Sequence, residues 1–425
     1  MQLIVRKSRL KGEVTIPASK SHTIRAVTIA SLAKGQSIIR NPLVSNDTQA
    51  AVDCYRSLGA NIDTSNAKFW TVTGVGGQAT AADEIINVGN SGTTLRIAMG
   101  SAALAKSGKS TILTGDEQIQ ARPIGPLIQA LNNLGARCIS LKNNGKAPVK
   151  VTGQLSGGKT TIAASTSQYL SSLLLCTPIA AQDTEIDVTL LNEPGYVQMT
   201  LDWLDKQRIE YQNENMRLFK IKGGQRYKGF DLTIPGDFSG ATFFLCAAAL
   251  IADEVTLLGL DLSDSQPDKA VVDYLTEMGA DIRIGKDFIT VKAAKLKGIE
   301  IDMNQTPDAL PAMAATAAFA EGTTKLTNAP QARAKETDRI NAVACELKKM
   351  AIDVEQLPDG LIIRHSRPKP ALLHGWADHR IVMALTLAGM AIDGQSTIDN
   401  AEAISVTFPT FVELMKSLGA NMQKK

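Results

Sequence analysis

The sequence of 425 residues has few of the residues that build disulfide frameworks or zinc sites. It contains five cysteines and four histidines, and no two cysteines are spaced as a CxxC pair. Cysteines that lie far apart are typical of free thiols in a reducing compartment. His379 has no second histidine or cysteine at the spacing of metal ligands, so we expect it to form hydrogen bonds. The sequence therefore predicts no metal site.

Long apolar runs and a large net charge are also lacking. The run from Ala241 to Ala252 is shorter than a membrane span requires, and charges begin in MQLIVRKSRLKGEV before any signal-peptide core. The formal net charge is only +3, which leaves no electrostatic footprint for nucleic acid or an anionic membrane. The chain is also too long for one compact core. We therefore expect a cytoplasmic protein of two domains, with no nucleic acid and no membrane among its partners.

One sequence pattern recurs six times along the chain. A tripeptide such as Leu-Gly-Ala follows an amphipathic stretch and precedes a short alternating strand, as in MGADIRIGKDFITVKA. The middle residues of four clear copies and two weaker ones are Gly59, Gly135, Gln207, Gly279, Ala351 and Gly419. A second series of Ala-rich stretches, such as ALIADEVTLLGL, alternates with the first. Each unit therefore predicts the order strand, apolar helix, strand, amphipathic helix and a hairpin of two strands.

The six units predict an α/β fold with three units in each of two domains. The apolar helices have no polar face, so we expect them to be buried between other elements. The first strand is expected to pair back with the last units. Residues 1–17 with 236–425 then form one domain, and residues 18–235 form the other. The two crossovers near Pro17 and Pro235 would act as hinges for domain closure.

The residues that open the helices indicate a site for anions. Small polar residues and glycine, as in GNSGTTLR, leave backbone N–H groups free at a helix start, where the helix dipole favours negative charge. N-capping alone explains such residues in many helices, and it is sufficient for Asp237 and Ser239. It does not explain Lys20, Arg25 and Arg380, because cations near a helix N-terminus oppose the dipole. A bound anion would compensate these cations.

Two further segments place basic residues at the start of amphipathic helices. ARPIG carries Arg122 just before Pro123, which we expect in the first helical turn. RAKETDR, from Arg333 to Arg339, is expected to open the corresponding helix of the fifth unit. A KETDR run alone is typical of a solvated helix face, but its equivalence to ARPIG favours a site wall. Together the helix starts predict one shared site for two small phosphate-bearing anions.

Eight short segments carry a resemblance to a known family. In order along nearly the whole chain they are IPASKSHTIRA, GNSGTTLR, ARPIG, STSQYL, PDA, RAKETDR, DHR and TFP. In these segments the sequence resembles the enolpyruvyl transferase family, and within it the 5-enolpyruvylshikimate-3-phosphate synthases. The resemblance implies a two-domain inside-out α/β barrel of six βαβαββ repeats.

The activity that this resemblance implies belongs to the shikimate pathway of aromatic amino-acid biosynthesis. The carboxyvinyl group of phosphoenolpyruvate is transferred to the 5-hydroxyl of shikimate 3-phosphate, and phosphate is released through a tetrahedral intermediate. The resemblance implies that no metal or organic cofactor takes part.

The resemblance also assigns substrate contacts residue by residue. The residues implied for phosphoenolpyruvate are Lys20, Asn90, Gly92, Arg122, Gln168, and, at its carboxylate, Arg339 and Arg380. The residues implied for shikimate 3-phosphate are Ser21 and Arg25 at its carboxylate, Thr166, Ser167 and Lys335 at its phosphate, and Lys20, Gln168, Tyr196, Asp308 and Gln331 elsewhere.

The implied reaction requires a base for the 5-hydroxyl and an acid that protonates C3 of phosphoenolpyruvate. Each such group contributes about two to four orders of magnitude. The resemblance implies Asp308 as the base and Glu336 as the acid, with Lys20 able to share the proton transfer. For Asp308 the alternative is a helix cap after Pro307. For Glu336 it is an ion pair with Arg339, and a glutamate among cations has a lowered pKa, so an acid role requires local desolvation.

Four positions depart from the family pattern. Val406 stands where a lysine that reaches phosphoenolpyruvate is common, and Glu193 where a serine usually helps to bind the shikimate phosphate. Gln331 replaces a common asparagine, and Ile97 follows Arg96 where proline is usual. A carboxylate at Glu193 would repel a phosphate at about 4 Å by about 1 to 4 kcal/mol. We expect weaker or altered substrate binding, with activity retained.

The sequence leaves two alternative functions open. The sister enzyme that carboxyvinylates UDP-N-acetylglucosamine carries Lys-Asn where this chain has Lys20-Ser21, and a cysteine on the loop before Arg-Pro, which GDEQIQ lacks. A non-catalytic paralogue that binds a phosphorylated metabolite is the second alternative, which Val406 and Glu193 favour slightly. The candidate catalytic residues and arginines favour an enzyme more strongly. Domain closure needs free surfaces, so we expect a monomer.

Overall fold

Each predicted repeat corresponds to a four-stranded sheet with its helices. The computed structural model describes residues 1–82, 84–106 and 108–425, and these residues form six such sheets. In the third repeat, β10 (Gly158–Ala164) runs parallel to β11 (Thr184–Leu191), because a helix connects them. β13 (Leu218–Ile221) pairs antiparallel with β11 and with β12 (Tyr211–Glu214), to which a short turn joins it.

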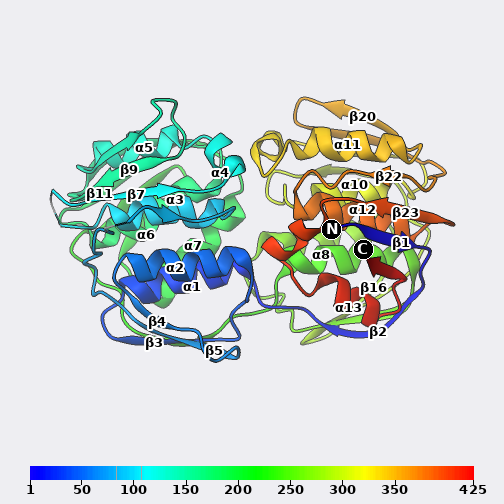
Figure 1. Cartoon of the computed structure of the whole chain (residues 1–425), viewed down its shortest axis with the longest axis horizontal. Helices are drawn as coiled ribbons and strands as arrows, with labels where there is room; N and C mark the ends of the chain where they lie inside the picture. The colour runs from blue at the N-terminus through cyan, green and yellow to red at the C-terminus, as the bar shows by residue number, and fades with distance from the viewer. Residues whose placement is uncertain (83, 107) are drawn as a thin grey trace. The chain divides into compact units, whose positions relative to one another are not determined.

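The chain divides into two units, each of which holds three of these sheets, and Figure 1 shows their elements. We call Met1–Ser19 with Pro235–Lys425 the terminal unit, and Lys20–Ile234 the middle unit.

The middle unit contains the second and third repeats and most of the first. Its other strands are β3 (Gln36–Arg40), β4 (Asn61–Asp63), β5 (Phe69–Thr73), β6 (Ile86–Asn87), β7 (Ser110–Thr114), β8 (Arg137–Ser140), β9 (Val149–Thr152) and β14 (Asp231–Thr233). Its helices are α1 (Lys20–Leu32), α2 (Asn46–Ser57), α3 (Gly92–Ala102), α4 (Glu117–Ala121), α5 (Gly125–Asn133), α6 (Ser167–Cys176) and α7 (Pro194–Lys206), with the 3-10 turn η1 (Thr177–Ile179).

The terminal unit contains the fifth and sixth repeats and most of the fourth. Its strands are β1 (Leu3–Arg6), β2 (Leu10–Thr15), β15 (Ala252–Leu258), β16 (Asp281–Ile284), β17 (Phe288–Lys292), β18 (Glu300–Asp302), β19 (Thr323–Thr327), β20 (Asp353–Leu357), β21 (Gly360–Arg364), β22 (Leu372–Leu373), β23 (Gln395–Ile398) and β24 (Met422–Lys424). Its helices are α8 (Phe238–Ile251), α9 (Ala270–Glu277), α10 (Leu310–Ala317), α11 (Arg339–Lys349), α12 (His379–Met390) and α13 (Phe411–Ser417), with the 3-10 turns η2 (Pro267–Lys269), η3 (Pro330–Ala334) and η4 (Ala401–Val406).

The first and fourth repeats exchange their first strands. β2 pairs in parallel with β15 of the terminal unit, and β14 pairs in parallel with β3 of the middle unit. β1 lies between β23 and β24 and completes the sixth sheet. The connections on either side of the exchange run antiparallel, with the N–H of Ser19 donating to the carbonyl of Pro235 at 2.8 Å and that of Asp237 to Pro17 at 2.9 Å.

A residue with left-handed backbone ends the amphipathic helix of each repeat. The repeated tripeptide glycines are such residues, with φ between 94° and 103° at Gly59, Gly135, Gly279 and Gly419. In the weaker copies the residues with positive φ are Arg208 and Ala351. The middle residue of the third copy is therefore Arg208, one position after the predicted Gln207. A left-handed residue after a helix is a common C-terminal cap, which is why the glycine marks the repeat in the sequence.

The apolar helices form the interior of each unit. α8, α10 and α12 contact one another in the terminal unit, and α3 contacts α1 and α6 in the middle unit. Every residue of α12 is buried. Strands such as β10 alternate between buried and exposed residues, so the sheets cover the helices and turn one face outward. The predicted inside-out α/β barrel with buried apolar helices is confirmed.

Two predicted helix starts are wrong. Arg122 ends α4 in an extended conformation, because a residue before proline disfavours the helical region, and α5 begins at Gly125 instead of Pro123. The helix of the fifth unit begins only at Arg339, where Asp338 accepts a capping hydrogen bond from the N–H of Asn341 at 3.0 Å. The rest of RAKETDR lies before the helix.

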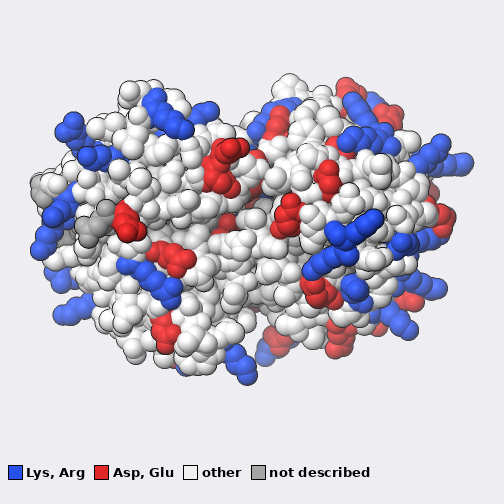
Figure 2. Space-filling view, in the orientation of Figure 1, with Lys and Arg blue, Asp and Glu red and all other residues white. Residues whose placement is uncertain are grey.

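The surface carries basic and acidic side chains together. On the face in Figure 2, Lys and Arg side chains lie among Asp and Glu over the terminal unit. Exposed ion pairs such as Arg364 to Glu355, at 2.9 Å, are typical of this surface. Among the residues that the structure describes, no helix combines the length and apolar character needed to cross a membrane.

Candidate active site

The N-terminus of α3 in the middle unit lies beside two guanidinium groups. A Cβ at Gly92, the first residue of α3, would lie 2.7 Å from Nη1 of Arg122 and 2.8 Å from Nη1 of Arg96. Both arginines are buried, and only glycine leaves room for the two groups at this point. Cations that gather at a helix start oppose the helix dipole unless an anion binds there. The geometry therefore favours a bound anion such as a phosphate.

Gln168 and Asn90 adjoin the same helix start. Gln168, in the first turn of α6, accepts a hydrogen bond from Nη1 of Arg96 at 2.5 Å. Asn90 donates to Oδ2 of Asp116 at 2.7 Å and to Oε1 of Gln118 at 2.5 Å. The predicted residues that lie at or next to the α3 start are Asn90, Gly92, Arg122 and Gln168.

Lys20 forms an ion pair that the sequence did not reveal. Its ammonium lies 3.0 Å from Oδ2 of Asp47, and the two side chains are 15% and 7% exposed. Lys20 begins α1, and Asp47 lies in the first turn of α2, which Ser45 caps. The carboxylate therefore neutralises the ammonium at the start of α1.

Arg25 is a buried cation held by neutral groups. Its Nη2 donates to the carbonyl of Tyr196 at 2.8 Å, its Nε to Oγ1 of Thr200 at 2.9 Å, and its Nη1 to the carbonyl of Ser21 at 3.1 Å. Within the described part of the chain, no carboxylate pairs with it. Burial lowers the pKa of Arg25 to about 10. A buried charge without a counter-ion is unfavourable, so this position favours a ligand carboxylate.

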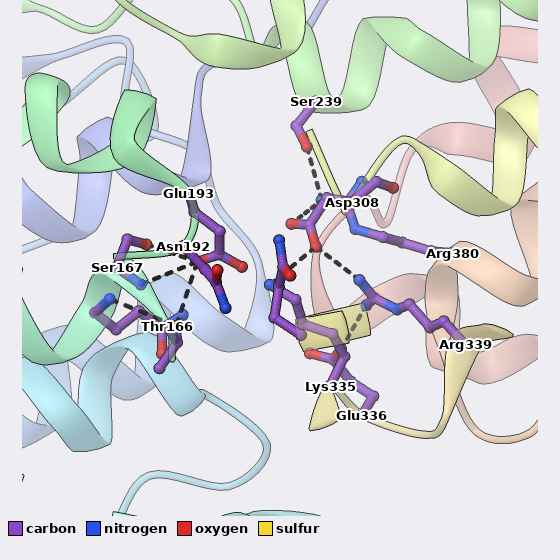
Figure 3. A network of polar contacts seen from close by, with 12 residues as sticks. Thr166, Ser167, Asn192, Glu193, Ser239, Asp308, Lys335, Glu336, Arg339 and Arg380 are labelled. Carbon is purple, nitrogen blue, oxygen red and sulfur yellow. Dashed lines mark hydrogen bonds and ion pairs between the residues drawn. The ribbon is translucent and has the colours of Figure 1, made fainter. Parts of the chain in front are cut away.

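Glu193 places its carboxylate at the N-terminus of α6. Its Oε2 accepts hydrogen bonds from the hydroxyl of Ser167 at 2.7 Å, from the N–H of Ser167 at 3.1 Å and from the hydroxyl of Thr166 at 3.3 Å. Figure 3 shows this carboxylate directed at both residues. Glu193 is only 2% exposed. The two residues predicted to bind a phosphate in this unit therefore bind a carboxylate of the protein itself.

In the terminal unit, Asp308 lies among three cations, which Figure 3 shows around its carboxylate. Oδ1 lies 2.7 Å from Nη1 of Arg339 and 3.5 Å from Nζ of Lys335, and Oδ2 lies 3.2 Å from Nη2 of Arg380. Burial alone would raise the pKa of Asp308, but the charges of the three cations hold it well below its usual range. Asp308 is therefore an ionised carboxylate that keeps 20% of its side-chain surface exposed.

Arg339 joins Asp308 to two more carboxylates. Its Nε donates to Oδ2 of Asp378 at 2.8 Å, and its Nη2 donates to Glu336. The side chains of Arg339 and Asp378 are buried, whereas that of Glu336 is 13% exposed. Burial would lower the pKa of Arg339, but Asp378, Glu336 and Asp308 raise it above its usual value. The guanidinium is therefore permanently charged.

Residues at or just before the starts of three helices position this network. Asp308 lies just before the first turn of α10, whose N-cap is Ala309, so the structure does not support the alternative of an Asp308 helix cap. Arg339 opens α11. Asp378 caps α12 by accepting from the N–H of Arg380 at 2.8 Å. The predicted residues Asp308, Lys335, Glu336, Arg339 and Arg380 are brought together in this way.

The prediction that Ser239 is only a capping residue is wrong. Asp237 does cap α8, because its side chain accepts from the N–H of Ser239 at 3.0 Å. The Ser239 hydroxyl, however, accepts from Nη2 of Arg380 at 2.8 Å and donates to Asp268 at 3.2 Å. The helix of the fourth repeat therefore also orients a candidate site residue.

The remaining departures from the family pattern lie in different environments. Gln331 donates through Nε2 to the carbonyl of Asn304 at 3.0 Å, and its buried Oε1 meets no donor among the residues described. Val406 ends the 3-10 turn η4, and Ile97 is buried in α3. His379 is buried, with Nδ1 3.8 Å from Oδ1 of Asp378. No group of three or more potential metal ligands occurs in the described ranges.

Sequence reasoning missed four residues of these groups. They are Asp47, Arg96, Ser239 and Asp378. Three of them open or cap helices and therefore looked like ordinary first-turn residues. Arg96 lies one turn into α3 and gave a usable signal, because a buried apolar helix rarely carries an arginine without a partner.

Comparison with known proteins gives a consistent result. The family model described as EPSP synthase (3-phosphoshikimate 1-carboxyvinyltransferase) matches residues 4–415. A 3-phosphoshikimate 1-carboxyvinyltransferase from Acetivibrio thermocellus is 52% identical over 422 residues, which are 99% of each chain. A protein of the same name from Methanocaldococcus jannaschii is 43% identical over an alignment of 430 positions, which covers 100% of this chain and 99% of the other.

Solved structures share the fold. An EPSP synthase from Acinetobacter baumannii matches with a TM-score of 0.83 and 28% identity over 99% of each chain. The enolpyruvyl transferase NikO from Streptomyces tendae matches with a TM-score of 0.79 and 20% identity, over 99% of this chain and 98% of the other. At that identity the second match speaks for the fold alone.

Proposed function

The chain belongs to the EPSP synthase (3-phosphoshikimate 1-carboxyvinyltransferase) family, and we propose that it transfers the carboxyvinyl group of phosphoenolpyruvate to shikimate 3-phosphate. The 5-hydroxyl of shikimate 3-phosphate is the acceptor, and inorganic phosphate leaves. The observation that carries this proposal is Asp308, an ionised and partly exposed carboxylate beside three cations. A base next to an anion-binding group is what the condensation of two anionic substrates requires.

Phosphoenolpyruvate needs cations for two anionic groups. We assign its phosphate to the residues around the α3 start together with Lys20, and its carboxylate to Arg339 and Arg380. The packing of Arg122 against Gly92 supports the first assignment. Arg339 and Arg380, assigned to the carboxylate, already form ion pairs with Asp308. A substrate carboxylate therefore exchanges with a carboxylate of the protein, and the fork of arginine suits both.

Shikimate 3-phosphate presents a carboxylate, a phosphate and hydroxyl groups. We assign its carboxylate to Arg25 and Ser21, and the absence of a carboxylate partner for Arg25 in the described residues supports this. We assign its phosphate to Thr166, Ser167 and Lys335. The remaining contacts are assigned to Lys20, Gln168, Tyr196, Asp308 and Gln331. Oε1 of Gln331, which meets no donor among the described residues, is suited to accept a hydrogen bond from a substrate hydroxyl.

The proposed chemistry is an addition followed by an elimination. Glu336, with Lys20 sharing the proton transfer, delivers a proton to C3 of phosphoenolpyruvate, which makes C2 electrophilic. Asp308 accepts the proton of the 5-hydroxyl as its oxygen bonds to C2, giving a tetrahedral intermediate. Glu336, ionised by the first step, then takes a proton from C3. The C2–C3 double bond forms again as the bond from C2 to the phosphate oxygen breaks, and inorganic phosphate leaves. Glu336 contacts Arg339, to which the carboxylate of phosphoenolpyruvate is assigned, so the proposed proton donor lies beside that substrate.

The test is the release of inorganic phosphate from phosphoenolpyruvate in the presence of shikimate 3-phosphate. Reactions without acceptor, and with UDP-N-acetylglucosamine instead, are the controls. We expect release only with shikimate 3-phosphate. No release with this acceptor at any pH or salt concentration, from protein with an intact melting transition, would refute the proposal. Release only with UDP-N-acetylglucosamine would establish the sister activity instead.

We also propose that the protein acts as a monomer in the cytoplasm, without a metal or organic cofactor. The five cysteines are free thiols, four of them buried, as is usual in a reducing compartment. Light scattering and activity in the presence of a chelator test the monomer and the independence from metal.

A further inference from the structure

The donor group at the N-terminus of α6 is already occupied by an anion of the protein. The hydroxyls of Thr166 and Ser167 and the N–H of Ser167 all donate to one oxygen of Glu193, at 2.7 to 3.3 Å. Under the proposed function, the same donors bind the phosphate of shikimate 3-phosphate. One oxygen of a carboxylate thus holds the place of a phosphate oxygen.

The backbone holds Glu193 in this position. Glu193 lies before α7 with φ 59° and ψ 48°, a left-handed conformation that residues with a Cβ adopt only when other contacts favour it. Its side chain does not cap its own helix, and it is turned to α6 instead. The carboxylate is buried, so its hydrogen bonds are shielded from water. The contact is therefore built into the chain at this turn.

A second feature of the same turn indicates a ligand. Tyr196, three residues after Glu193, gives its carbonyl to Arg25 at 2.8 Å, and this buried guanidinium has no carboxylate partner among the described residues. One cation beside α7 thus lacks an anion, while the donors beside it already hold one. An acceptor with both a carboxylate and a phosphate would pair with Arg25 freely but would have to displace Glu193.

We propose that Glu193 determines the affinity and specificity for the acceptor phosphate: its carboxylate occupies the phosphate position in the ligand-free protein, and shikimate 3-phosphate binds by displacing it. The inference rests on the proposed function. Glu193 weakens the binding of shikimate 3-phosphate and leaves that of unphosphorylated shikimate unchanged. It therefore reduces the discrimination between the two compounds.

The size of the effect follows from the bonds that must be exchanged. Hydrogen bonds to a charged group are roughly twice as strong as neutral ones, and three of them are lost when the carboxylate leaves. Glu193→Gln keeps an oxygen acceptor but removes the charge, and Glu193→Ser vacates the position. We expect the KM for shikimate 3-phosphate to fall about tenfold or more in both variants, which is about 1.4 kcal/mol.

The experiment compares both variants with Glu210→Gln, which removes one carboxylate from the same unit at a site 71% exposed and paired with Lys222. The KM for shikimate 3-phosphate, the KM for phosphoenolpyruvate and the inhibition constant of shikimate are measured in each protein. Inorganic phosphate is the probe that does not depend on the acceptor. Its Kd is measured by calorimetry, and its position is found in crystals soaked with phosphate.

A lower KM for shikimate 3-phosphate in the two Glu193 variants, with unchanged shikimate inhibition and an unchanged Glu210→Gln control, supports the inference. Tighter binding of inorganic phosphate at Ser167 in the variants supports it even if no acceptor turns over, in which case the proposed function alone fails. Unchanged or raised KM and Kd values in folded variants overturn the inference. If the unaltered protein then still turns over shikimate 3-phosphate, the proposed function stands without it.

Discussion

Replacement of Asp308 by asparagine tests the proposed base with the least change in shape. The amide keeps the size of the carboxylate and can still accept hydrogen bonds from Arg339 and Arg380, but it cannot take a proton from the acceptor hydroxyl. We expect kcat to fall by about two to four orders of magnitude, the usual contribution of a positioned general base. We also expect the KM for phosphoenolpyruvate to fall.

The second expectation follows from the charge balance of the ion-pair network. Within the described residues, three basic side chains (Lys335, Arg339, Arg380) contact three acidic ones (Asp308, Glu336, Asp378). Asp308→Asn removes one negative charge beside Arg339 and Arg380, and with it a competitor for the substrate carboxylate. Two unit charges at about 4 Å interact by about 4 kcal/mol at an effective dielectric of about 20. Since Asp308 is partly exposed, we expect about a quarter of this, which is roughly a fivefold lower KM.

The low pKa of Asp308 adds a test by pH. Burial raises this pKa, but Arg380, Lys335 and Arg339 lower it well below the ordinary value of about 3.9. The folded-state pKa is thus depressed, so Asp308 contributes stability above the unfolded pKa, and that contribution is lost as pH falls through the folded pKa. We expect the difference in melting temperature between the unaltered protein and Asp308→Asn to be constant near neutral pH. Below about pH 4 the difference should shrink.

The assay is phosphate release under saturating shikimate 3-phosphate, with Asp353→Asn as the control. Asp353 is 61% exposed and pairs with Arg364 at 3.2 Å, so its loss changes the net charge by the same amount away from the network. A fall in kcat of less than tenfold would refute the role of Asp308 as a base. A raised KM for phosphoenolpyruvate would show instead that Asp308 helps to hold the arginines in place.

Three further substitutions test other parts of the assignment. In Gly92→Ala the new Cβ would lie 2.7 Å from Nη1 of Arg122, so the KM for phosphoenolpyruvate should rise about tenfold, and an unchanged value would contradict a phosphate at this helix start. Arg25→Met should raise the KM for shikimate 3-phosphate about 10- to 100-fold, as expected when a charged hydrogen bond is lost, and an equal rise for phosphoenolpyruvate would contradict the assignment to the acceptor. Glu346→Gln weakens the hydrogen bond that Nε1 of Trp376 donates to Glu346 at 2.9 Å, in the turn before α12. We therefore expect kcat to fall several-fold and the tryptophan fluorescence to shift. A fluorescence change with unaltered kinetics would show a purely structural role of Glu346.

The fold was predictable because short stretches of the sequence carry the features that mark each repeat. A left-handed residue ends each amphipathic helix, and the buried helices have apolar residues on every side, so both signals are visible within a few turns of chain. The count of six repeats predicts that residues 1–17 belong with 236–425, but no local feature specifies the partner strands of β2 and β14. β2 pairs with β15 about 240 residues away and β14 with β3 about 190 residues away, and short alternating strands of similar length are interchangeable in the sequence.

Residue patterns alone predicted the site only as far as its cations, and the resemblance to a known family added the carboxylates of Asp308 and Glu336. Lysine and arginine at a helix start conflict with the dipole, and that conflict can be read from a few residues. The carboxylate partners Asp47 and Asp378 could not be predicted, because they are ordinary first-turn and capping residues until the fold places them beside Lys20 and Arg339. For Glu193 the sequence predicted repulsion of a phosphate. The structure adds that the carboxylate binds the donors of Ser167, which depends on the left-handed turn.

In this structure, carboxylates of the protein itself already contact most cations and hydrogen-bond donors of the candidate site. Asp47 neutralises Lys20, Asp308 bonds with Arg380, and the α6 start holds Glu193. Substrate binding under the proposed function is then an exchange of anions, and its free energy is the difference between two similar interactions. Arg25 differs, because its described partners are all neutral. The carboxylate of the acceptor therefore gains a full ion pair at Arg25, and this contact should contribute more to acceptor affinity than the phosphate does while Glu193 is present.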